Sequence, residues 1–246
     1  MLEISYNIKG LHLVELWFSS NIPLERFSLL KLCCYRDSRV NRDTFGLKKE
    51  EKYTLVHDLT LSQDSLFSTF KPNVRNEIRK HEKINNFFYH ANFNSKLLFL
   101  NFYKKFAEAK KLPHLQEHSI AKYKDNLFYV HGTLEGKLTN LQVYLVDKES
   151  GIVRLLHSIS TLYEESDKQK KAKIGWINRY LHWYTMLYFK AENFKIFDWG
   201  GFSNNPNSSL AGIDKFKASF GGEQIKLYDY YTLPYYSMKL LQERIL

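Results

Sequence analysis

Two β-rich runs, LFYVHGTL over Leu127–Leu134 and LTNLQVYLV over Leu138–Val146, are separated only by Glu135-Gly136-Lys137. Aromatic and β-branched residues favour extended backbone, and a glycine between two such runs is typical of a hairpin turn. A turn over residues 147–151 then leads to a third run, Ile152–Ser160. The sequence therefore predicts three consecutive antiparallel strands.

Helical patterns stand on either side of these strands. Leu97–Lys111 has apolar residues at helical spacing, and Ile174–Ala191 is apolar almost all round, which is typical of a buried helix. The later elements are a strand Ile196–Trp199 closed by Gly200-Gly201, a short helix Ile213–Phe220 and a tyrosine-rich strand Gln224–Leu233. The earlier ones are short strands and turns over residues 1–60, a helix Ser65–Phe70 and a helix Asn73–Lys83 opened by Pro72. This order predicts an α/β protein with a mixed sheet flanked by helices.

The composition favours a protein that handles anions. Lysine and arginine outnumber the acids 36 to 26, a formal charge of +10, and such an excess attracts nucleic acid, phosphorylated metabolites or an acidic membrane surface. The 17 Tyr, 18 Phe and 4 Trp are enough to fill a core or to line a ligand groove. We expect no metal site, because the two cysteines, Cys33 and Cys34, are adjacent and no metal-type spacing occurs.

The sequence also predicts a cytoplasmic location. Its start, Met1-Leu-Glu-Ile-Ser-Tyr6, lacks the basic and apolar regions of a signal peptide. No run of about 18 apolar residues suggests a membrane span. Two cysteines that are unsuited to bridging each other fit a reducing compartment.

Three segments resemble a known family when they are taken together. They are Phe67–Lys83 (FSTFKPNVRNEIRKHEK), Asn178–Gly201, which contains NRYLHW and FKIFDWGG, and Gly212–Gly222 (GIDKFKASFGG). Their order and spacing are similar to those of the Fem peptidyltransferase branch of the GNAT acyltransferase superfamily. Members of that branch carry a K-x-x-x-R-x-x-I-R-K helix, a strand ending D-x-G-G and a G-x-x-x-F-K-x-x-F-G-G segment. The resemblance covers residues 65–235.

This resemblance implies a complete GNAT-like acyltransferase unit over residues 86–246 and a partial second GNAT-like unit over residues 1–85 that includes the basic helix. It implies direct attack of an acceptor amine on the donor, without a covalent enzyme intermediate. We expect an N-acyltransferase that moves an acyl group from acyl-CoA to an amine of an amino sugar or amino acid in polysaccharide or cell-envelope synthesis. The acceptor is expected to be a small molecule or a nucleotide- or lipid-linked sugar.

Two alternatives remain open. The first is aminoacyl-tRNA-dependent, Fem-like transfer to a peptidoglycan precursor. The usual Q/R-x-x-G-x-G/A pyrophosphate loop of acetyl-CoA enzymes is reduced here to Gly175, and the Fem branch also lacks that loop. The second is a non-catalytic nucleic-acid-binding protein, since single-strand binders combine positive charge with aromatic residues. The dispersed basic residues and the absence of an RNA-binding signature weigh against it.

The phosphates of the donor are expected at the start of the long helix. In the superfamily they sit at the N-terminus of the helix after the central strand. Here that N-terminus is predicted near Ile174 and Gly175, where the macrodipole and the unbonded N–H groups favour an anion. Lys170, Lys171 and Lys173 precede it in a predicted polar loop. These three lysines and Gly175 are the candidate donor site.

A second basic group is the candidate acceptor site. Lys71, Arg75 and Arg79 recur every four residues and line one face of the helix opened by Pro72. Such a stripe suits a nucleotide or a lipid-linked diphosphate, although a solvated helix face gives the same pattern.

Asp198 is the leading catalytic candidate. It ends a strand, where α/β sheets usually bind ligands, and Gly200 and Gly201 beside it permit close approach of a substrate. Its carboxylate is expected to accept a proton from the acceptor amine or to orient it. His157 is a candidate general base from the preceding strand, and Tyr230 is a candidate hydroxyl acid from the last one. For each of the three side chains a structural role is the alternative.

Overall fold

The fold is known from a computed structural model that describes residues 1–22, 30–85, 87–203, 205, 207–208 and 210–245. Within these residues ten strands are hydrogen-bonded in the order β1-β2-β3-β10-β4-β9-β8-β7-β6-β5. Parallel and antiparallel pairs both occur, so the predicted mixed sheet flanked by helices is confirmed.

The chain divides into two compact units. Met1–Thr54, Gly201–Asn204 and Gln224–Leu246 form the first unit, and Leu55–Gly200 with Asn205–Glu223 form the second. The division differs from the predicted boundary at residue 85, because the N-terminal strands share a unit with the end of the chain. That the first unit is a partial GNAT-like copy stays a prediction.

The second unit contains the predicted hairpin and most of the helices. Its strands are β5 (Phe87–Asn92), β6 (Leu127–Leu134), β7 (Lys137–Asp147), β8 (Ile152–Ser160), the end of β4 (Leu47–Asp58) and most of β9 (Ile196–Phe202). Its helices are α1 (Gln63–Ser68), α2 (Pro72–His81), α3 (Lys96–Lys110), α4 (Glu117–Ala121), α5 (Lys168–Ala191) and α6 (Ala211–Ala218), with short 3-10 turns at Lys124–Asn126 and Thr161–Tyr163. The predicted strands of the hairpin are confirmed to within one residue.

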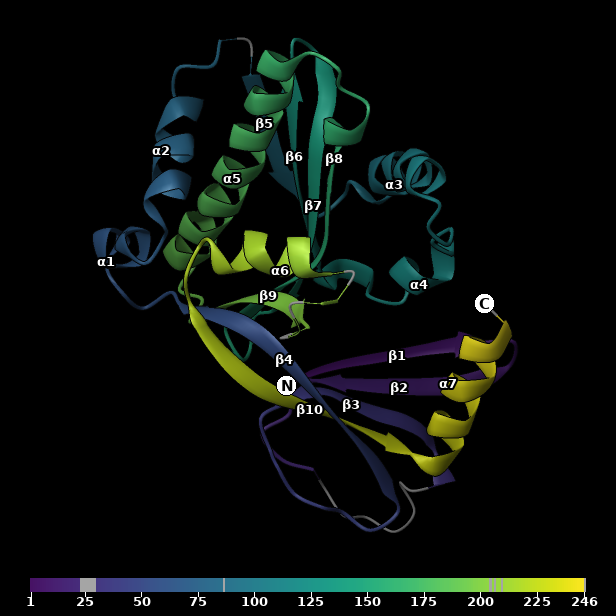
Figure 1. The fold of residues 1–246 in the computed structure, drawn as a ribbon. Helices are drawn as coiled ribbons and strands as arrows, with labels where there is room; N and C mark the ends of the chain where they lie inside the picture. The colour runs from purple at the N-terminus through teal and green to yellow at the C-terminus, as the bar shows by residue number, and fades with distance from the viewer. Residues whose placement is uncertain (23–29, 86, 204, 206, 209, 246) are drawn as a thin grey trace. The chain divides into compact units, whose positions relative to one another are not determined.

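Helices cover both faces of strands β6–β8 (Figure 1). On one face Tyr144 of β7 contacts His182 of α5. On the other face His157 of β8 packs against Phe99 of α3, with ring centroids 5.1 Å apart. The predicted helix at Ile174–Ala191 therefore packs across the sheet, as the apolar sequence indicated.

The long helix begins six residues before the predicted start. The carboxylate of Asp167 accepts hydrogen bonds from the backbone N–H groups of Gln169 (2.7 Å) and Lys170 (3.2 Å). An aspartate in this role is a strong N-cap, so α5 begins at Lys168 and the lysines that follow are helical. The prediction of a lysine-rich loop there is wrong. Strand β5 and the C-terminal helix α7 (Leu233–Ile245) were not predicted.

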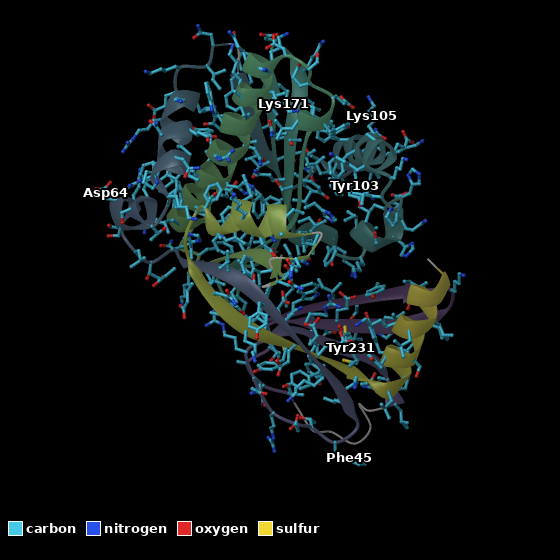
Figure 2. All side chains as sticks on the ribbon, in the orientation of Figure 1. Phe45, Asp64, Tyr103, Lys105, Lys171 and Tyr231 are labelled. Carbon is cyan, nitrogen blue, oxygen red and sulfur yellow. The ribbon has the colours of Figure 1, made fainter. Side chains whose placement is uncertain are left out.

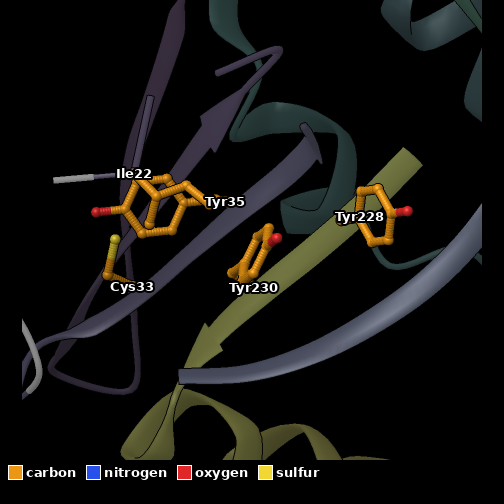
Figure 3. Close-up of a cluster of buried hydrophobic side chains, with 5 residues drawn as sticks. All are labelled: Ile22, Cys33, Tyr35, Tyr228 and Tyr230. Carbon is orange, nitrogen blue, oxygen red and sulfur yellow. The ribbon is translucent and has the colours of Figure 1, made fainter. Parts of the chain in front are cut away.

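The first unit contains β1 (Leu2–Ile8), β2 (Leu11–Trp17), β3 (Leu32–Ser38), most of β10 (Glu223–Thr232) and α7. Strands β1 and β2 form an antiparallel hairpin, β2 and β3 are parallel, and β3 and β10 are antiparallel. One buried cluster contains Ile22, Cys33, Tyr35, Tyr228 and Tyr230 (Figure 3), and another contains Leu13, Cys34, Tyr231 and Tyr235. Much of the tyrosine content therefore fills a core.

Among the described glycines, Gly221 has the closest backbone neighbour. Its φ is +76°, and a Cβ built there would stand 2.3 Å from the carbonyl oxygen of Thr69. Gly136, in the β6–β7 turn, has nearly the same φ of +74°, but a Cβ there would meet nothing within 4 Å. A comparison of the two glycines therefore distinguishes the energetic cost of the left-handed backbone conformation from the cost of steric overlap with Thr69.

We expect Gly221→Ala to lower the free energy of unfolding by at least about 2 kcal/mol more than Gly136→Ala. Both substitutions add the left-handed backbone penalty of about 1–2 kcal/mol, but only the first forces a side chain onto a backbone carbonyl. Urea unfolding of the two variants gives the comparison. Equal losses of stability would show that the approach to Thr69 relaxes at no cost.

Candidate functional site

The three segments that resemble Fem proteins meet in the second unit. The carbonyl oxygen of Phe220 accepts a hydrogen bond from the ring of His57 (3.0 Å) and lies 3.3 Å from Thr69 Oγ1, whose one hydrogen is closer to the Leu66 carbonyl (2.8 Å). The indole N–H of Trp199 donates to Nδ1 of His57 (3.0 Å). Because Nδ1 accepts, the ring proton of neutral His57 is on Nε2, which donates to Phe220. One carbonyl and one imidazole therefore connect α6, β9 and the α1–α2 segment.

An aromatic cluster fills the space between these elements. Trp199 and Phe220 have ring centroids 4.6 Å apart, and Phe70 contacts both Phe220 (5.2 Å) and Trp183 (5.3 Å). Each pair is tilted or edge-on, the arrangement that aromatic rings favour. The cluster fixes the position of α6 against the end of β9.

Strands β8 and β9 separate at the residue that sequence analysis singled out. Their parallel register covers three pairs and ends at Arg154 and Asp198. Beyond this point β8 continues to Ser160 alongside β7, through a register shift after Leu155. Gly200 has a φ of +70°, and a Cβ there would stand 2.6 Å from the carbonyl oxygen of Leu155. We call the region where β8 and β9 diverge the wedge.

Asp198 lies buried at the base of the wedge. One of its carboxylate oxygens accepts the backbone N–H of Gly200 (2.7 Å), and the other lies 3.8 Å from Nε of Arg154. The hydrogen bond within its own turn gives Asp198 a structural role, and the guanidinium places a positive charge beside it. Gly201 is exposed, with room for a side chain.

Lys217 of α6 completes this group of charges, and sequence analysis did not select it. Its ammonium donates to the carbonyl oxygen of Gly200 (3.4 Å). Burial and, next, the positive charge of Arg154 lower the pKa of Lys217 to about 8, against the opposing effect of the carboxylates of Asp198 and Asp214. The F-K pair of the third segment was the available signal, since Lys217 is its lysine.

The other two catalytic candidates have structural surroundings. His157 packs between Phe99 and Tyr103 of α3, and burial lowers its pKa to about 4, which makes it a weak base. Tyr230 is buried in the first unit, where its hydroxyl donates to the Val40 carbonyl (2.7 Å) and accepts from the Arg42 N–H (3.0 Å) (Figure 3).

The four residues of the predicted donor site have different surroundings. Lys170 pairs with Glu135 (3.2 Å), and Figure 2 shows Lys171 near the beginning of α5. Lys173 is half-buried within the helix. Gly175 is also inside α5, and its carbonyl accepts from Arg179 (3.2 Å). The prediction of a helix N-terminus at Gly175 is therefore wrong, because Asp167 caps the helix two turns earlier.

The basic stripe on α2 has the predicted orientation. Val74 and Ile78 are buried and dock the helix, whereas Lys71 and Arg79 are exposed and Arg75 is half-buried. The backbone N–H of Lys71 donates to the carbonyl of Ser219 (2.9 Å). The stripe therefore begins at the end of α6, the helix that carries Lys217.

Comparisons with known proteins support the fold. Neither a family model nor any curated protein matches the sequence. Among solved structures, FemX is similar at a TM-score of 0.67 and 12% identity, over 96% of this chain and 85% of that chain. The C-terminal domain of a putative lysylphosphatidylglycerol synthetase from Agrobacterium fabrum is similar at a TM-score of 0.61 and 10% identity, over 99% and 85%. L-PGS from Bacillus licheniformis is similar at a TM-score of 0.52 and 15% identity, over 88% of this chain and 74% of that chain.

These neighbours confirm that the chain has a Fem-like, GNAT-like fold. Among the described helices, none is long and apolar enough to cross a membrane. Within the described ranges, no three His, Cys, Asp or Glu side chains are grouped to hold a metal ion.

We expect Lys217 to titrate near pH 8, well below the ordinary lysine pKa of 10.5. Asp198→Asn should lower this pKa further, because the carboxylate stabilises the ammonium. Arg154→Met should raise it, because a neighbouring positive charge is lost. Carbon-13 NMR of reductively methylated protein measures the titration, and Lys217→Arg assigns the resonance. Shifts in the opposite directions would refute this electrostatic picture.

Proposed function

We propose that the protein is an acyltransferase that joins an activated acyl or aminoacyl group to an amine at the wedge. The observation that carries this proposal is the group of buried Asp198 and Arg154 and half-buried Lys217 at the point where the β8–β9 register ends. The fold shared with FemX and with a lysylphosphatidylglycerol synthetase domain supports the same class of reaction.

Each charged group has a role in this reaction. The acceptor nitrogen attacks the donor carbonyl carbon, the bond from that carbon to the leaving oxygen or sulfur breaks, and a proton passes from nitrogen to the leaving group. Lys217, as an ammonium, stabilises the negative charge that develops on the carbonyl oxygen. Asp198 orients the attacking amine and accepts its hydrogen bond. Arg154 places a positive charge beside the Asp198 carboxylate.

We favour an aminoacyl-tRNA donor over acyl-CoA. The carboxylate of Asp167 already bonds the first N–H groups of α5, where a coenzyme A pyrophosphate is expected, and its charge repels an anion. The formal charge of +10 suits a polyanionic donor. Acyl-CoA, with Lys170, Lys171 and Lys173 near its phosphates, remains the alternative donor to be tested.

The acceptor is proposed to be an amino sugar or amino acid, carried on a phosphorylated nucleotide or lipid. Lys71, Arg75 and Arg79 are its proposed phosphate contacts. The bond from Lys71 to Ser219 links the stripe to the helix of Lys217. Gly201 leaves room for the acceptor, whereas the space beside Gly200 is filled by the Leu155 carbonyl.

We expect Lys217→Met to reduce kcat by about 100-fold, the usual loss when an oxyanion-stabilising group is removed. Asp198→Asn should cost at least about tenfold. Because Lys217 loses its proton near pH 8, wild-type turnover should fall as the pH rises through that value. Lys215→Met and Asp64→Asn are controls, since both side chains are exposed (Figure 2 labels Asp64).

Mass spectrometry of acylated glucosamine and acylated lysine measures these rates. Circular dichroism shows whether each variant is folded. Folded Lys217→Met and Asp198→Asn proteins with wild-type turnover would exclude this site from the reaction.

The donor is identified by a direct comparison. Total tRNA charged with carbon-14 amino acids and carbon-14 acetyl-CoA are each offered with glucosamine or lysine. We expect transfer from the charged tRNA, with an apparent Kd that weakens steeply with salt, because tRNA presents many phosphates. Changing Lys71, Arg75 and Arg79 to Gln should leave the donor Kd unchanged when the acceptor is unphosphorylated. Transfer from acetyl-CoA alone would reverse the donor assignment, and transfer from neither would refute the proposed function.

A further inference from the structure

A chain of polar side chains runs along the α5 side of the sheet. Its members are Gln142 and Tyr144 of β7, Ser158 of β8, and Asn178 and His182 of α5. Gln142, Tyr144 and His182 are fully buried, whereas Ser158 is exposed. A buried hydrogen-bonded chain with one end in solvent can impose a direction on that end.

One backbone carbonyl, which can only accept hydrogen bonds, sets the direction in which each hydrogen bond of the chain points. The Asn178 backbone carbonyl lies 3.2 Å from the side-chain amide of Gln142, so the NH₂ of that amide must face it. The Gln142 oxygen then faces the Tyr144 hydroxyl at 2.7 Å, and Tyr144 must donate. A hydroxyl has one hydrogen. Toward Nδ1 of His182, at 3.0 Å, Tyr144 therefore accepts, and the ring proton of His182 is on Nδ1.

This arrangement determines the state of Ser158. Nε2 of His182, 3.4 Å from Ser158 Oγ, has a lone pair and no proton. The second neighbour of Ser158 Oγ is Oδ1 of Asn178, at 3.5 Å. This oxygen is also an acceptor, and it accepts a hydrogen bond from the second N–H of the Gln142 amide. The Ser158 hydrogen is therefore directed inward. No described residue donates to Ser158 Oγ, whose lone pairs are left toward solvent.

Ser158 is on the part of β8 beyond its last pair with β9. It lies four residues beyond Arg154, where the register with β9 ends. The His182 ring beside it also contacts Trp199 of β9 (centroids 4.7 Å apart) and Phe216 of α6 (5.8 Å). Ser158 is thus next to the elements that carry Asp198 and Lys217.

We propose that Ser158 Oγ accepts a hydrogen bond from the attacking amine of the acceptor, and that His182 and Tyr144 are positioning residues that hold Ser158 in this accepting state. The proposal rests on the acyl-transfer function above and adds a residue to it. It does not make Ser158 a nucleophile. Burial and the nearby charges of Lys217 and Arg179 lower the pKa of His182 to about 3, so its imidazole is too weak a base to remove the serine proton.

The first test needs no substrate. Nitrogen-15 NMR of histidine-labelled protein reports the tautomer of His182, which a His182→Gln variant assigns. We expect the Nδ1–H form, although free histidine favours Nε2–H. In Tyr144→Phe the acceptor for Nδ1–H is lost, so His182 should change to Nε2–H and donate to Ser158. Wild-type protein in the Nε2–H form would overturn the inference.

The second test measures turnover with glucosamine or lysine and whichever of the two donors is used. Ser158→Ala should lower kcat about five- to tenfold, the effect of one lost hydrogen bond. Tyr144→Phe should lower it similarly, and the double variant should be no worse than either single one, because both remove the same acceptor. Ser160→Ala, two residues along the same face of β8, should retain wild-type kcat.

The two proposals fail in different ways. If transfer occurs and depends on Lys217, but Ser158→Ala retains wild-type kcat, the role of Ser158 is refuted and the function stands. If no donor supports transfer, the proposed function is refuted together with the amine contact. A combination of the Nδ1–H tautomer and matching losses in Ser158→Ala and Tyr144→Phe supports the inference.

Discussion

The carbonyl of Phe220 is the point on which the second unit depends. It accepts a hydrogen bond from His57, which in turn is held by Trp199, and it lies next to the Thr69 hydroxyl. Only a glycine at position 221 allows the chain to pass the Thr69 carbonyl after this contact. The three segments that resemble Fem proteins are therefore explained by packing as well as by chemistry. Their glycines and aromatic residues lock α6 to the α1–α2 segment and to β9, and this lock determines where Lys217 lies.

Because these contacts fix α6 in place, a partly buried charged site can form with only a modest loss of stability. Placing an ammonium in a partly buried position is unfavourable unless compensating groups are fixed nearby. Burial and the charge of Arg154 lower the pKa of Lys217 to about 8, and the carboxylates of Asp198 and Asp214 limit this shift. A lysine tuned in this way remains largely protonated at neutral pH. It is nevertheless poorly solvated, so it interacts more strongly with a developing oxyanion than a surface lysine does.

Local patterns in the sequence predicted the β6–β8 meander, because alternation and a Glu135-Gly136 turn are features of neighbouring residues. The start of α5 was missed, although Asp167 before a run of good helix formers was an available N-cap signal. Asp198 could be selected from its place at the end of a strand. Lys217 and Ser158 could not, since their roles depend on burial, on the separation of β8 from β9 and on hydrogen-bond directions set by residues far along the chain.

In the proposed reaction, the charged group and the neutral hydrogen-bonded chain have different roles. Phe197 contacts Tyr144, and Trp199 contacts His182, so Asp198, which lies between Phe197 and Trp199 in an extended strand, points to the opposite face. Asp198 therefore faces away from α5, whereas α6, which carries Lys217, packs on the α5 face, where Phe216 contacts His182 and Trp199. The α5 side carries no net charge in its chain from Gln142 to Ser158. A neutral, fully directed chain can orient an amine without holding its proton, which leaves the nitrogen lone pair available for attack on the donor carbonyl.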